Sequence, residues 1–298
     1  IYNPAKSDWA AVLKRPTQTV ADIEDLVNGI FSEVAKDGDV TLKKYTAQFD
    51  KVTLDNMLVS DVEIEEAKAL VSDELKSAIQ LAKSNIEVFH TAQKTVRVEV
   101  ETTAGVACWQ EKRPIQKVGL YIPGGTAPLF STILMLAVPA NIAGCSEIVL
   151  CSPPDKEGKL NPAILYTANL CGVTKIVKVG GIQAIAGMTF GTETIPQVYK
   201  IFGPGNQYVT VAKQIATKHG VAIDMPAGPS ELLVVADDSA DAAFVASDLL
   251  SQAEHGVDSQ VILVSTSKEM INAVEKEVAV QLEDLPRKEI ARQAIANS

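Results

Sequence analysis

From Lys117 onward, short apolar runs alternate with longer segments of helical periodicity, and this alternation restricts the possible folds more than any other feature. Two parallel strands need a long crossover connection, usually a helix, so the pattern predicts parallel sheets with helices on both faces. The strands are too many for one simple α/β half, and we therefore expect two α/β units. Strands are expected at 117–122, 147–152, 175–180, 198–203, 221–226, 231–237 and 260–265.

The first third of the chain is helical by the spacing of its apolar residues, over 19–50 and again over 60–93. Ser60 and Asp61 are candidate caps for the second segment. Prolines and glycines punctuate 224–231, where we expect a domain join. The predicted domains are an N-terminal segment (1–19), a first, discontinuous α/β domain (20–114 plus 230–298) and a second α/β domain (115–229).

Composition excludes several classes of protein. The 298 residues carry a formal net charge of −10, whereas nucleic acids and anionic membranes attract basic surfaces. The longest apolar run, 129–144, is broken by Pro139 and predicts a buried helix rather than a membrane span. The four cysteines show no zinc-finger or CxxC spacing, so we expect buried or half-buried thiols in a reducing cytoplasm.

Three glycine-containing loops follow predicted strands and precede predicted helices. They read YIPGGTAP from Tyr121, VGGIQAIAG from Val179 and FGPGNQYVT from Phe202. Backbone N–H groups at such helix starts attract phosphate. None of the loops is a complete GxGxxG fingerprint, and Tyr208 stands where the third glycine would be. Each loop alone is consistent with an ordinary turn, but three in one unit favour nucleotide binding.

The segment SDLLSQAEHG, 247–256, places Gln252 and His255 three residues apart near a helix end. Two interpretations are open: an ordinary helix terminus, or half of a metal site. Imidazole is a common zinc ligand and an amide oxygen is an unusual one, so these residues alone favour the terminus. The other two histidines, His90 and His219, are predicted to lie at helix ends as well.

Five long blocks, in order, resemble the histidinol dehydrogenase family: GLYIPGGTAPLFSTILMLAVPANIAGC, GGIQAIAGMTFGTE, KIFGPGNQYVTVAK, AIDMPAGPSELLVVAD and VASDLLSQAEHGVDSQVIL. The resemblance implies two incomplete Rossmann-like units similar to those of aldehyde dehydrogenases. It also implies oxidation of L-histidinol to L-histidine through L-histidinaldehyde with two NAD⁺, the last step of histidine biosynthesis. The implied protein is a zinc-dependent, cytoplasmic homodimer.

The same resemblance implies roles for individual residues. NAD contacts fall on Tyr121, Gln183 and Asn206, and a substrate contact falls on Ser230. Zinc ligation falls on Gln252 and His255, which are also implied to lie near the substrate, and the helix-end interpretation then gives way to a metal site.

No catalytic residue is assigned within the 298 residues. The Glu-His proton acceptors of the family, and the aspartate and second histidine of its zinc shell, have no match up to Ser298, and Glu254-His255 belongs to the ligand block instead. We therefore expect these residues alone to be inactive. Two further interpretations stay open, namely a non-catalytic nucleotide-binding fragment and a related zinc- and NAD-dependent dehydrogenase of another small amino alcohol.

Overall fold

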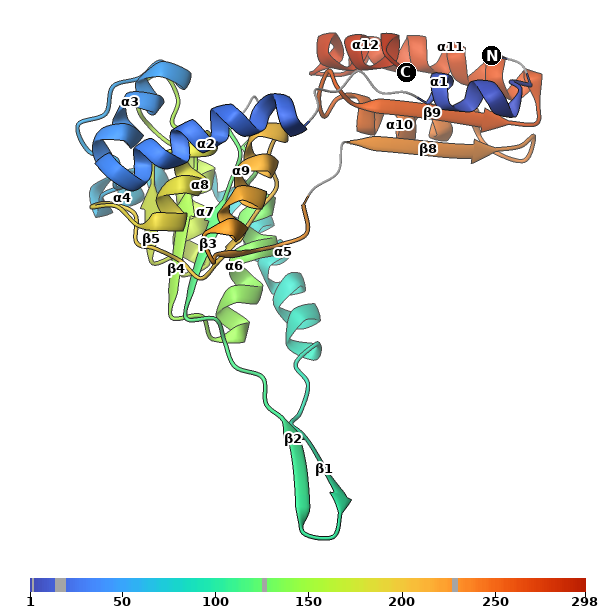
Figure 1. Ribbon diagram of the computed structural model, residues 1–298. Helices are drawn as coiled ribbons and strands as arrows, with labels where there is room; N and C mark the ends of the chain where they lie inside the picture. The colour runs from blue at the N-terminus through green and yellow to red at the C-terminus, as the bar shows by residue number, and fades with distance from the viewer. Residues whose placement is uncertain (2, 14–19, 125–127, 227–229) are drawn as a thin grey trace. The chain divides into compact units, whose positions relative to one another are not determined.

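The computed structural model describes residues 1, 3–13, 20–124, 128–226 and 230–298. By its internal contacts the chain divides into two compact units (Figure 1). The larger unit is Val20–Ala227, and the smaller unit joins Ile1–Thr19 to Gly228–Ser298. The division falls in the segment where the domain join is predicted, although residues 227–229 themselves lie outside the described part.

The larger unit is built on a parallel sheet of five strands. Its spatial order is β5-β4-β3-β6-β7, so the order reverses between β3 and β6. Helices connect consecutive strands, as the alternation of the sequence predicts. The strands are β3 (Lys117–Tyr121), β4 (Glu147–Cys151), β5 (Lys175–Val177), β6 (Lys200–Phe202) and β7 (Ala222–Ile223), and the helices are α6 (Phe130–Ala143), α7 (Pro162–Leu170), α8 (Gly181–Phe190) and α9 (Gln207–Lys218).

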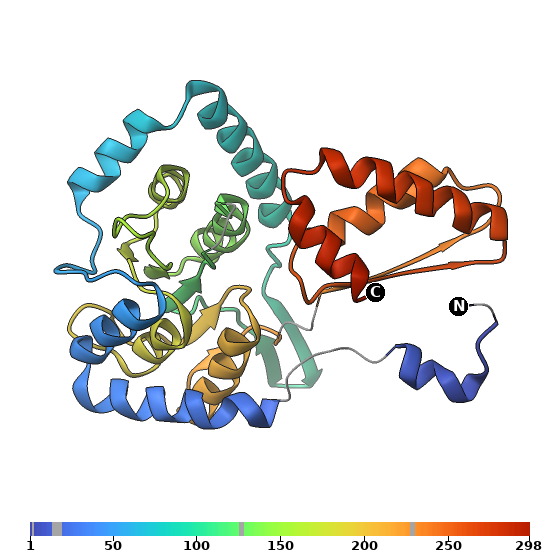
Figure 2. The same cartoon turned by 90° about the horizontal axis from the view of Figure 1, so that it is seen from above.

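Both faces of this sheet are buried because its strands are apolar at nearly every position. Side chains alternate along a strand, so neighbouring residues enter opposite cores. Ile148 and Leu150 belong to the core formed with α6 and α7, whereas Val149 and Cys151 belong to the core formed with α8 and α9. The result is a three-layer α/β/α unit, visible end-on in Figure 2.

The N-terminal helices complete these two layers. They are α2 (Val20–Asp37), α3 (Asp39–Phe49), α4 (Asp61–Leu70) and α5 (Asp73–Ala92). Their grouping differs from the predicted domain of 20–114 plus 230–298, because they pack on the sheet of the larger unit. The apolar stripe of α2, including Val27 and Ile30, shares one core with Val177 of β5. Periodicity predicts that such a stripe is buried, but it does not indicate the partner.

Local chemistry divides each predicted helical segment in two. Gly38 has a φ of +51°, a conformation that costs glycine little, and it separates α2 from α3. Ser60 caps α4, as predicted, in a capping box with Glu63, and Ser72 caps α5. Glu63 also accepts a hydrogen bond of 2.8 Å from the buried Lys178, which ties α4 to the end of β5.

A β-hairpin that the sequence analysis does not predict follows α5. Its strands β1 (Val98–Thr103) and β2 (Val106–Gln110) pair antiparallel, and all their residues are exposed. The hairpin extends away from the sheet of its unit (Figure 1). Cys108 is therefore exposed, contrary to the expectation of a buried or half-buried thiol, while all four cysteines are free, as expected.

The smaller unit contains a second parallel pair of strands covered by helices. Strands β8 (Glu231–Ala236) and β9 (Gln260–Ser265) are joined through α10 (Ala242–Ala253), and α11 (Lys268–Asp284) and α12 (Lys288–Ala296) follow. Near the N-terminus lie the short helices η1 (Lys6–Asp8) and α1 (Trp9–Val12). Across the described parts of both units, we find no helix with the length and apolar character needed to span a membrane.

Gly203, directly after β6, brings the ends of β6 and β3 together. Its φ is +130°, and a Cβ atom added there would lie 2.1 Å from the carbonyl oxygen of Tyr121. Asp224 accepts a 2.8 Å hydrogen bond from the N–H of Gly203, and Lys213 donates one of 2.8 Å to its carbonyl oxygen. Lys213 and Asp224 also form an ion pair, so both polar backbone groups of Gly203 are held.

Gly203→Ala is expected to lower the free energy of unfolding by more than about 3 kcal/mol, since a strained φ and a backbone clash add together. Chemical denaturation measures the loss. Gly220→Ala is the matched control, because Gly220 has a φ of +83° with nothing within 4 Å of the added Cβ. Gly220→Ala should lower the free energy of unfolding by about 1–2 kcal/mol. Equal losses in the two variants would contradict the close contact between Gly203 and Tyr121.

Candidate functional site

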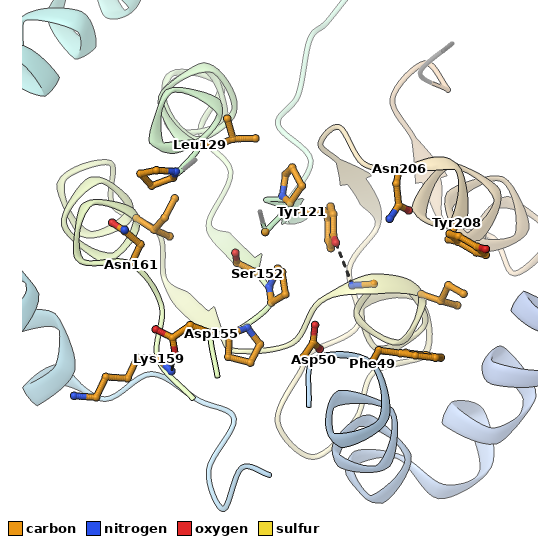
Figure 3. Close-up of a pocket in the computed structure, with 18 of the residues that line it drawn as sticks. Phe49, Asp50, Tyr121, Leu129, Ser152, Asp155, Lys159, Asn161, Asn206 and Tyr208 are labelled. Atoms are coloured by element: carbon orange, nitrogen blue, oxygen red, sulfur yellow. Dashed lines mark hydrogen bonds between the residues drawn. The ribbon is translucent and has the colours of Figure 1, made fainter. Parts of the chain in front are cut away.

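A cavity of about 920 Å³ opens at the carboxyl edge of the five-stranded sheet (Figure 3). It lies where β3, β4 and β6 end and where α8 and α9 begin. This is the place where open α/β sheets bind their ligands, outside the strand ends at the point where strand order reverses. Its polar lining residues include Asp50, Tyr121, Ser152, Asp155, Lys159, Asn161, Asn206 and Tyr208.

Glycines allow the loops around this cavity to pack closely. A Cβ added to Gly124 would lie 2.4 Å from Cγ of Pro153, and one added to Gly180 would lie 2.4 Å from its Cβ. Pro153, after β4, is therefore enclosed by the loop after β3 and the loop after β5. Two of the three predicted glycine-containing loops meet here, and the third lines the cavity through Asn206 and Tyr208. Residues 125–127 of the first loop lie outside the described part.

Tyr121 lies at the end of β3 with its hydroxyl at the cavity. The side chain is only 4% exposed, and its hydroxyl oxygen accepts a 3.1 Å hydrogen bond from the N–H of Gly181. Burial raises the pKa of Tyr121 to about 12. The hydroxyl is consequently neutral near pH 7, and its proton remains available to an acceptor in the cavity.

Gln183 lies in the first turn of α8, two residues after the cavity-lining Gly181. It is 1% exposed, and neither its amide nitrogen nor its amide oxygen has a hydrogen-bond partner among the described residues. A buried polar group without a partner is costly and rare. An amide that can both donate and accept, next to a cavity, fits a bound cofactor that supplies the missing partners.

Asn206 is the N-cap of α9 and lines the opposite side of the cavity from Asn161 (Figure 3). Its side-chain oxygen accepts a 3.1 Å hydrogen bond from the N–H of Val209. The side chain is exposed, so its amide nitrogen is open to a ligand. Of the three implied NAD contacts, Tyr121 and Asn206 line this cavity, and Gln183 lies behind its lining residues Gly181 and Ile182 in the sequence of α8. The roles of all three remain predictions.

The other implied residues belong to the smaller unit. Ser230 is exposed immediately before β8, and its carbonyl oxygen accepts a 3.0 Å hydrogen bond from the N–H of Gln260. Gln252 lies in the last turn of α10 and His255 follows the helix, with the N–H of His255 bonded to the carbonyl oxygen of Gln252 at 3.1 Å. Gln252 is half-buried and His255 is exposed.

The fit of this pair to zinc is incomplete. Within the described ranges, no group of three or more histidine, cysteine, aspartate or glutamate side chains lies close enough to hold a metal ion. Even a catalytic zinc normally has three protein ligands, and Gln252 with His255 supplies two donors. The described residues therefore do not form a zinc site by themselves.

Three of the four cysteines, Cys145, Cys151 and Cys171, are poor candidates for the nucleophile of a covalent mechanism like that of the aldehyde dehydrogenases. Burial raises the pKa of Cys151, at the end of β4, to about 12 and that of Cys171 to about 11. Burial also raises the pKa of Cys145. Since the thiolate is the reactive form, these three thiols are unreactive at neutral pH.

Sequence reasoning missed the wall contributed by the helical layer. Phe49 ends α3, Asp50 follows it, and Leu26 lies on α2, yet all three line the cavity. An aspartate after an amphipathic helix has no pattern that distinguishes it from an ordinary helix end. Only the packing of α3 against the sheet brings it to the strand ends.

An open parallel sheet with a cavity at its switch point defines the class of α/β proteins that bind a ligand, often a nucleotide, outside the strand ends. A sequence model described as histidinol dehydrogenase matches residues 13–298. The histidinol dehydrogenase of Bacteroides thetaiotaomicron is 60% identical over all 298 residues, which span 70% of its length, and that of Escherichia coli is 55% identical over 95% of this chain and 65% of its own. The chain therefore belongs to the histidinol dehydrogenase family, whose members are oxidoreductases.

Solved structures agree with this assignment. The crystal structure of histidinol dehydrogenase from Elizabethkingia anophelis superposes with a TM-score of 0.92 at 58% identity, covering 99% of this chain and 68% of that one. A betaine aldehyde dehydrogenase from Staphylococcus aureus gives a TM-score of 0.51 at 13% identity, covering 90% and 50% of the two chains. The second likeness shows the fold alone, which is the aldehyde-dehydrogenase-like α/β fold that the sequence predicts.

Gln183→Met is expected to raise the free energy of unfolding of the ligand-free protein by about 1–2 kcal/mol, since a nearly isosteric apolar side chain removes two unpartnered polar atoms. Thermal or chemical denaturation measures the gain. Thr167→Val is the matched control, because Thr167 is also fully buried with an unpartnered hydroxyl but does not line the cavity. A loss of stability in Gln183→Met alone would contradict an unpartnered amide.

Proposed function

We propose that this chain acts in the zinc-dependent oxidation of L-histidinol to L-histidine through L-histidinaldehyde, with two molecules of NAD⁺ reduced, in the cytoplasm. Family membership supports the reaction and the substrate. The observation that carries the cofactor assignment is the buried, unpartnered amide of Gln183 beside the cavity that Tyr121 and Asn206 line. Four free cysteines are typical of proteins from a reducing compartment.

The cavity residues would bind and orient the cofactor, which supplies a hydride acceptor when bound. Gln183 can donate from its amide nitrogen and accept at its amide oxygen, so it suits a group such as a carboxamide that does both. Tyr121 stays protonated and can donate its hydroxyl hydrogen. Asn206 can donate from its amide nitrogen while its oxygen holds the start of α9.

Substrate and metal contacts are proposed for the smaller unit. Ser230 would contact L-histidinol, and Gln252 and His255 would each give one ligand to zinc. The partial negative charge at the end of α10 favours a cation there. We derive no chemical step through the metal, because these residues provide only two of the donors that zinc requires.

Two alternatives make different predictions. A non-catalytic nucleotide-binding fragment would bind NAD⁺ and oxidise nothing. A related zinc- and NAD-dependent dehydrogenase would oxidise another small amino alcohol. Family membership at 60% identity favours histidinol over both.

The deciding measurement is the amount of NADH released per histidinol consumed by the purified protein with zinc present. Two NADH per histidinol are expected from a protein that contains this chain together with the family's proton acceptors. The 298 residues alone should bind NAD⁺ and release no NADH, and Gln183→Met should weaken that binding at least tenfold. Turnover of a different amino alcohol in preference to histidinol would favour the related dehydrogenase instead, and binding of no nucleotide would contradict the proposal.

We also propose that the chain forms a homodimer, with the β1–β2 hairpin as part of the contact. An isolated two-stranded hairpin is marginally stable in water. Here Val98, Val100 and Cys108 share one exposed face, because Val100 pairs with Cys108 across the ribbon. Helix α5, which leads into the hairpin, exposes an apolar stripe that includes Leu81 and Val88. The family resemblance implies a homodimer, and we propose that a second copy of the chain covers these surfaces.

The double variant Val98→Thr, Val100→Thr should raise the dimer dissociation constant at least tenfold, since it makes the hairpin face polar while keeping β-branched side chains. Sedimentation equilibrium measures the constant. Val280→Thr, at an exposed position of α11, is the control and should leave it unchanged. A monomeric wild-type protein, or an unchanged constant in the double variant, would contradict the assignment of this face.

A further inference from the structure

Asp50 is a half-buried residue that lines the cavity, and one of its carboxylate oxygens has no partner in the described structure. The Oδ2 atom is inaccessible to solvent and has no hydrogen-bond partner among the described residues. Figure 3 shows the side chain pointing toward the hydrogen bond between Tyr121 and Gly181, and the charge of Asp50 acts on the Tyr121 hydroxyl. A carboxylate is rarely buried without a partner unless it serves a ligand.

The position of Asp50 is set by rigid structure. Helix α3 buries Leu42 and Tyr45 in the core beneath the sheet, and the N–H of Asp50 donates to the carbonyl oxygen of Thr46 at 2.9 Å. At the other end of α3, the N–H of Asp39 donates to Glu193 at 2.9 Å. The carboxylate of Asp50 is thus held at the strand ends by a helix fixed at both termini.

A second carboxylate lines the cavity at the place where a dinucleotide fold ordinarily positions its ribose acceptor. Asp155 follows β4, the strand next to β3, and ordinary sites of this kind use an acidic residue there. However, Oδ1 of Asp155 already accepts hydrogen bonds from the N–H groups of Glu157 at 3.0 Å and Lys159 at 2.8 Å. Asp155 is exposed, and it shapes the turn that it begins.

The surroundings of Asp50 indicate which donor it would accept. Among the described lining residues, the charged side chains are those of Asp50, Asp155 and Lys159, and no ion pair is formed by Asp50. Phe49, beside it, is 44% exposed and lines the same cavity, so a flat base has an aromatic surface to contact. A base against Phe49 would bring its attached sugar, with two neighbouring hydroxyl donors, toward Asp50.

We propose that Asp50, rather than Asp155, accepts the hydroxyl groups of the adenosine ribose and thereby selects NAD⁺ over its 2′-phosphorylated form. This inference rests on the proposed function, because it assumes that the cavity binds the dinucleotide. Two hydroxyls can donate to the two oxygens of one carboxylate, whereas a 2′-phosphate would bring negative charge against a buried negative charge.

The ionisation of Asp50 agrees with this role and supplies an independent measurement. Burial raises the pKa of Asp50 to about 6, so the folded protein holds its proton more tightly than the unfolded chain does. The ionised carboxylate of Asp50 therefore lowers the free energy of unfolding by its full amount above pH 6. This loss disappears as the pH falls below about 4, where the group is protonated in both the folded and the unfolded states. Asp50→Asn should therefore be more stable than the wild type at pH 8 and no more stable at pH 4.

The test is isothermal titration of NAD⁺ and NADP⁺ into the wild type, Asp50→Asn and Asp155→Asn at pH 7.5. Asp50→Asn should bind NAD⁺ at least tenfold more weakly, as expected for the loss of a charge-assisted hydrogen bond, and its preference for NAD⁺ over NADP⁺ should fall at least tenfold. Asp155→Asn is the matched control. It removes an equal charge from the same cavity but keeps an oxygen for the turn, and its preference should be unchanged.

Each result has one interpretation. An unchanged preference in Asp50→Asn, or a lost preference in Asp155→Asn, would overturn the assignment while leaving NAD⁺ binding intact. If the wild type binds neither nucleotide, the proposed function itself fails. A preference lost in Asp50→Asn together with the stability gain at pH 8 separates loss of a ligand contact from damage to the fold.

Discussion

The contact between Gly203 and the carbonyl of Tyr121 is the constraint on which the rest of the larger unit depends. It brings the ends of β6 and β3 so close that no side chain fits between them. Lys213, on α9, and Asp224, after β7, hold both polar groups of Gly203, so the end of β6 is also fixed to the elements on its other side. The cavity forms beside this contact, and the loops that line it start from fixed points. The sheet therefore determines where the loops that line the cavity begin.

The seven strands expected from the sequence are all present, because each lies in a short apolar run. In β4 the run reflects burial on both faces, whereas β8 has an equally apolar run with Leu233 and Val235 exposed. The hairpin was missed, although VEVETTAGVACWQ alternates and contains a turn glycine. Its strands lack the apolar runs that mark the others, since neither of its faces is buried within the described chain. An apolar run, rather than alternation, therefore distinguishes the strands that the sequence predicts from the two that it does not.

The lining of the cavity was anticipated from the sequence at Tyr121 and Asn206, whose roles stay predictions. Tyr121, Gln183 and Asn206 came from matched blocks near glycine-containing loops, where the backbone geometry constrains the residue types. Asp50 lies outside those loops, and its importance arises from a contact between layers. For the same reason, the sequence analysis groups the N-terminal helices with 230–298, whereas they pack on the sheet of the larger unit. An amphipathic stripe such as that of α2 indicates that one face of the helix is buried, but it does not indicate which sheet that face packs on.

Unpartnered polar groups near this cavity lower the free energy of unfolding of the ligand-free protein. Gln183 and Asp50 both bury atoms that find no partner within the described structure. By contrast, the buried Lys178 and Lys213 are each paired with a carboxylate and hold structural elements together. Unpartnered buried groups also occur away from the cavity, for example at Thr167 and Ser259. The missing partner together with the position near the cavity therefore makes Gln183 and Asp50 candidates for ligand contacts.

The smaller unit takes its parts from both ends of the chain, with Ile1–Thr19 grouped with Gly228–Ser298. During synthesis the N-terminal segment must therefore wait while all of Val20–Ala227 is made, roughly 10 to 40 seconds at ~5–20 residues per second. The larger unit is continuous and can complete its core in that time. The order of translation consequently favours a sequence in which the sheet that carries the cavity folds first, and Ile1–Thr19 joins Gly228–Ser298 afterwards.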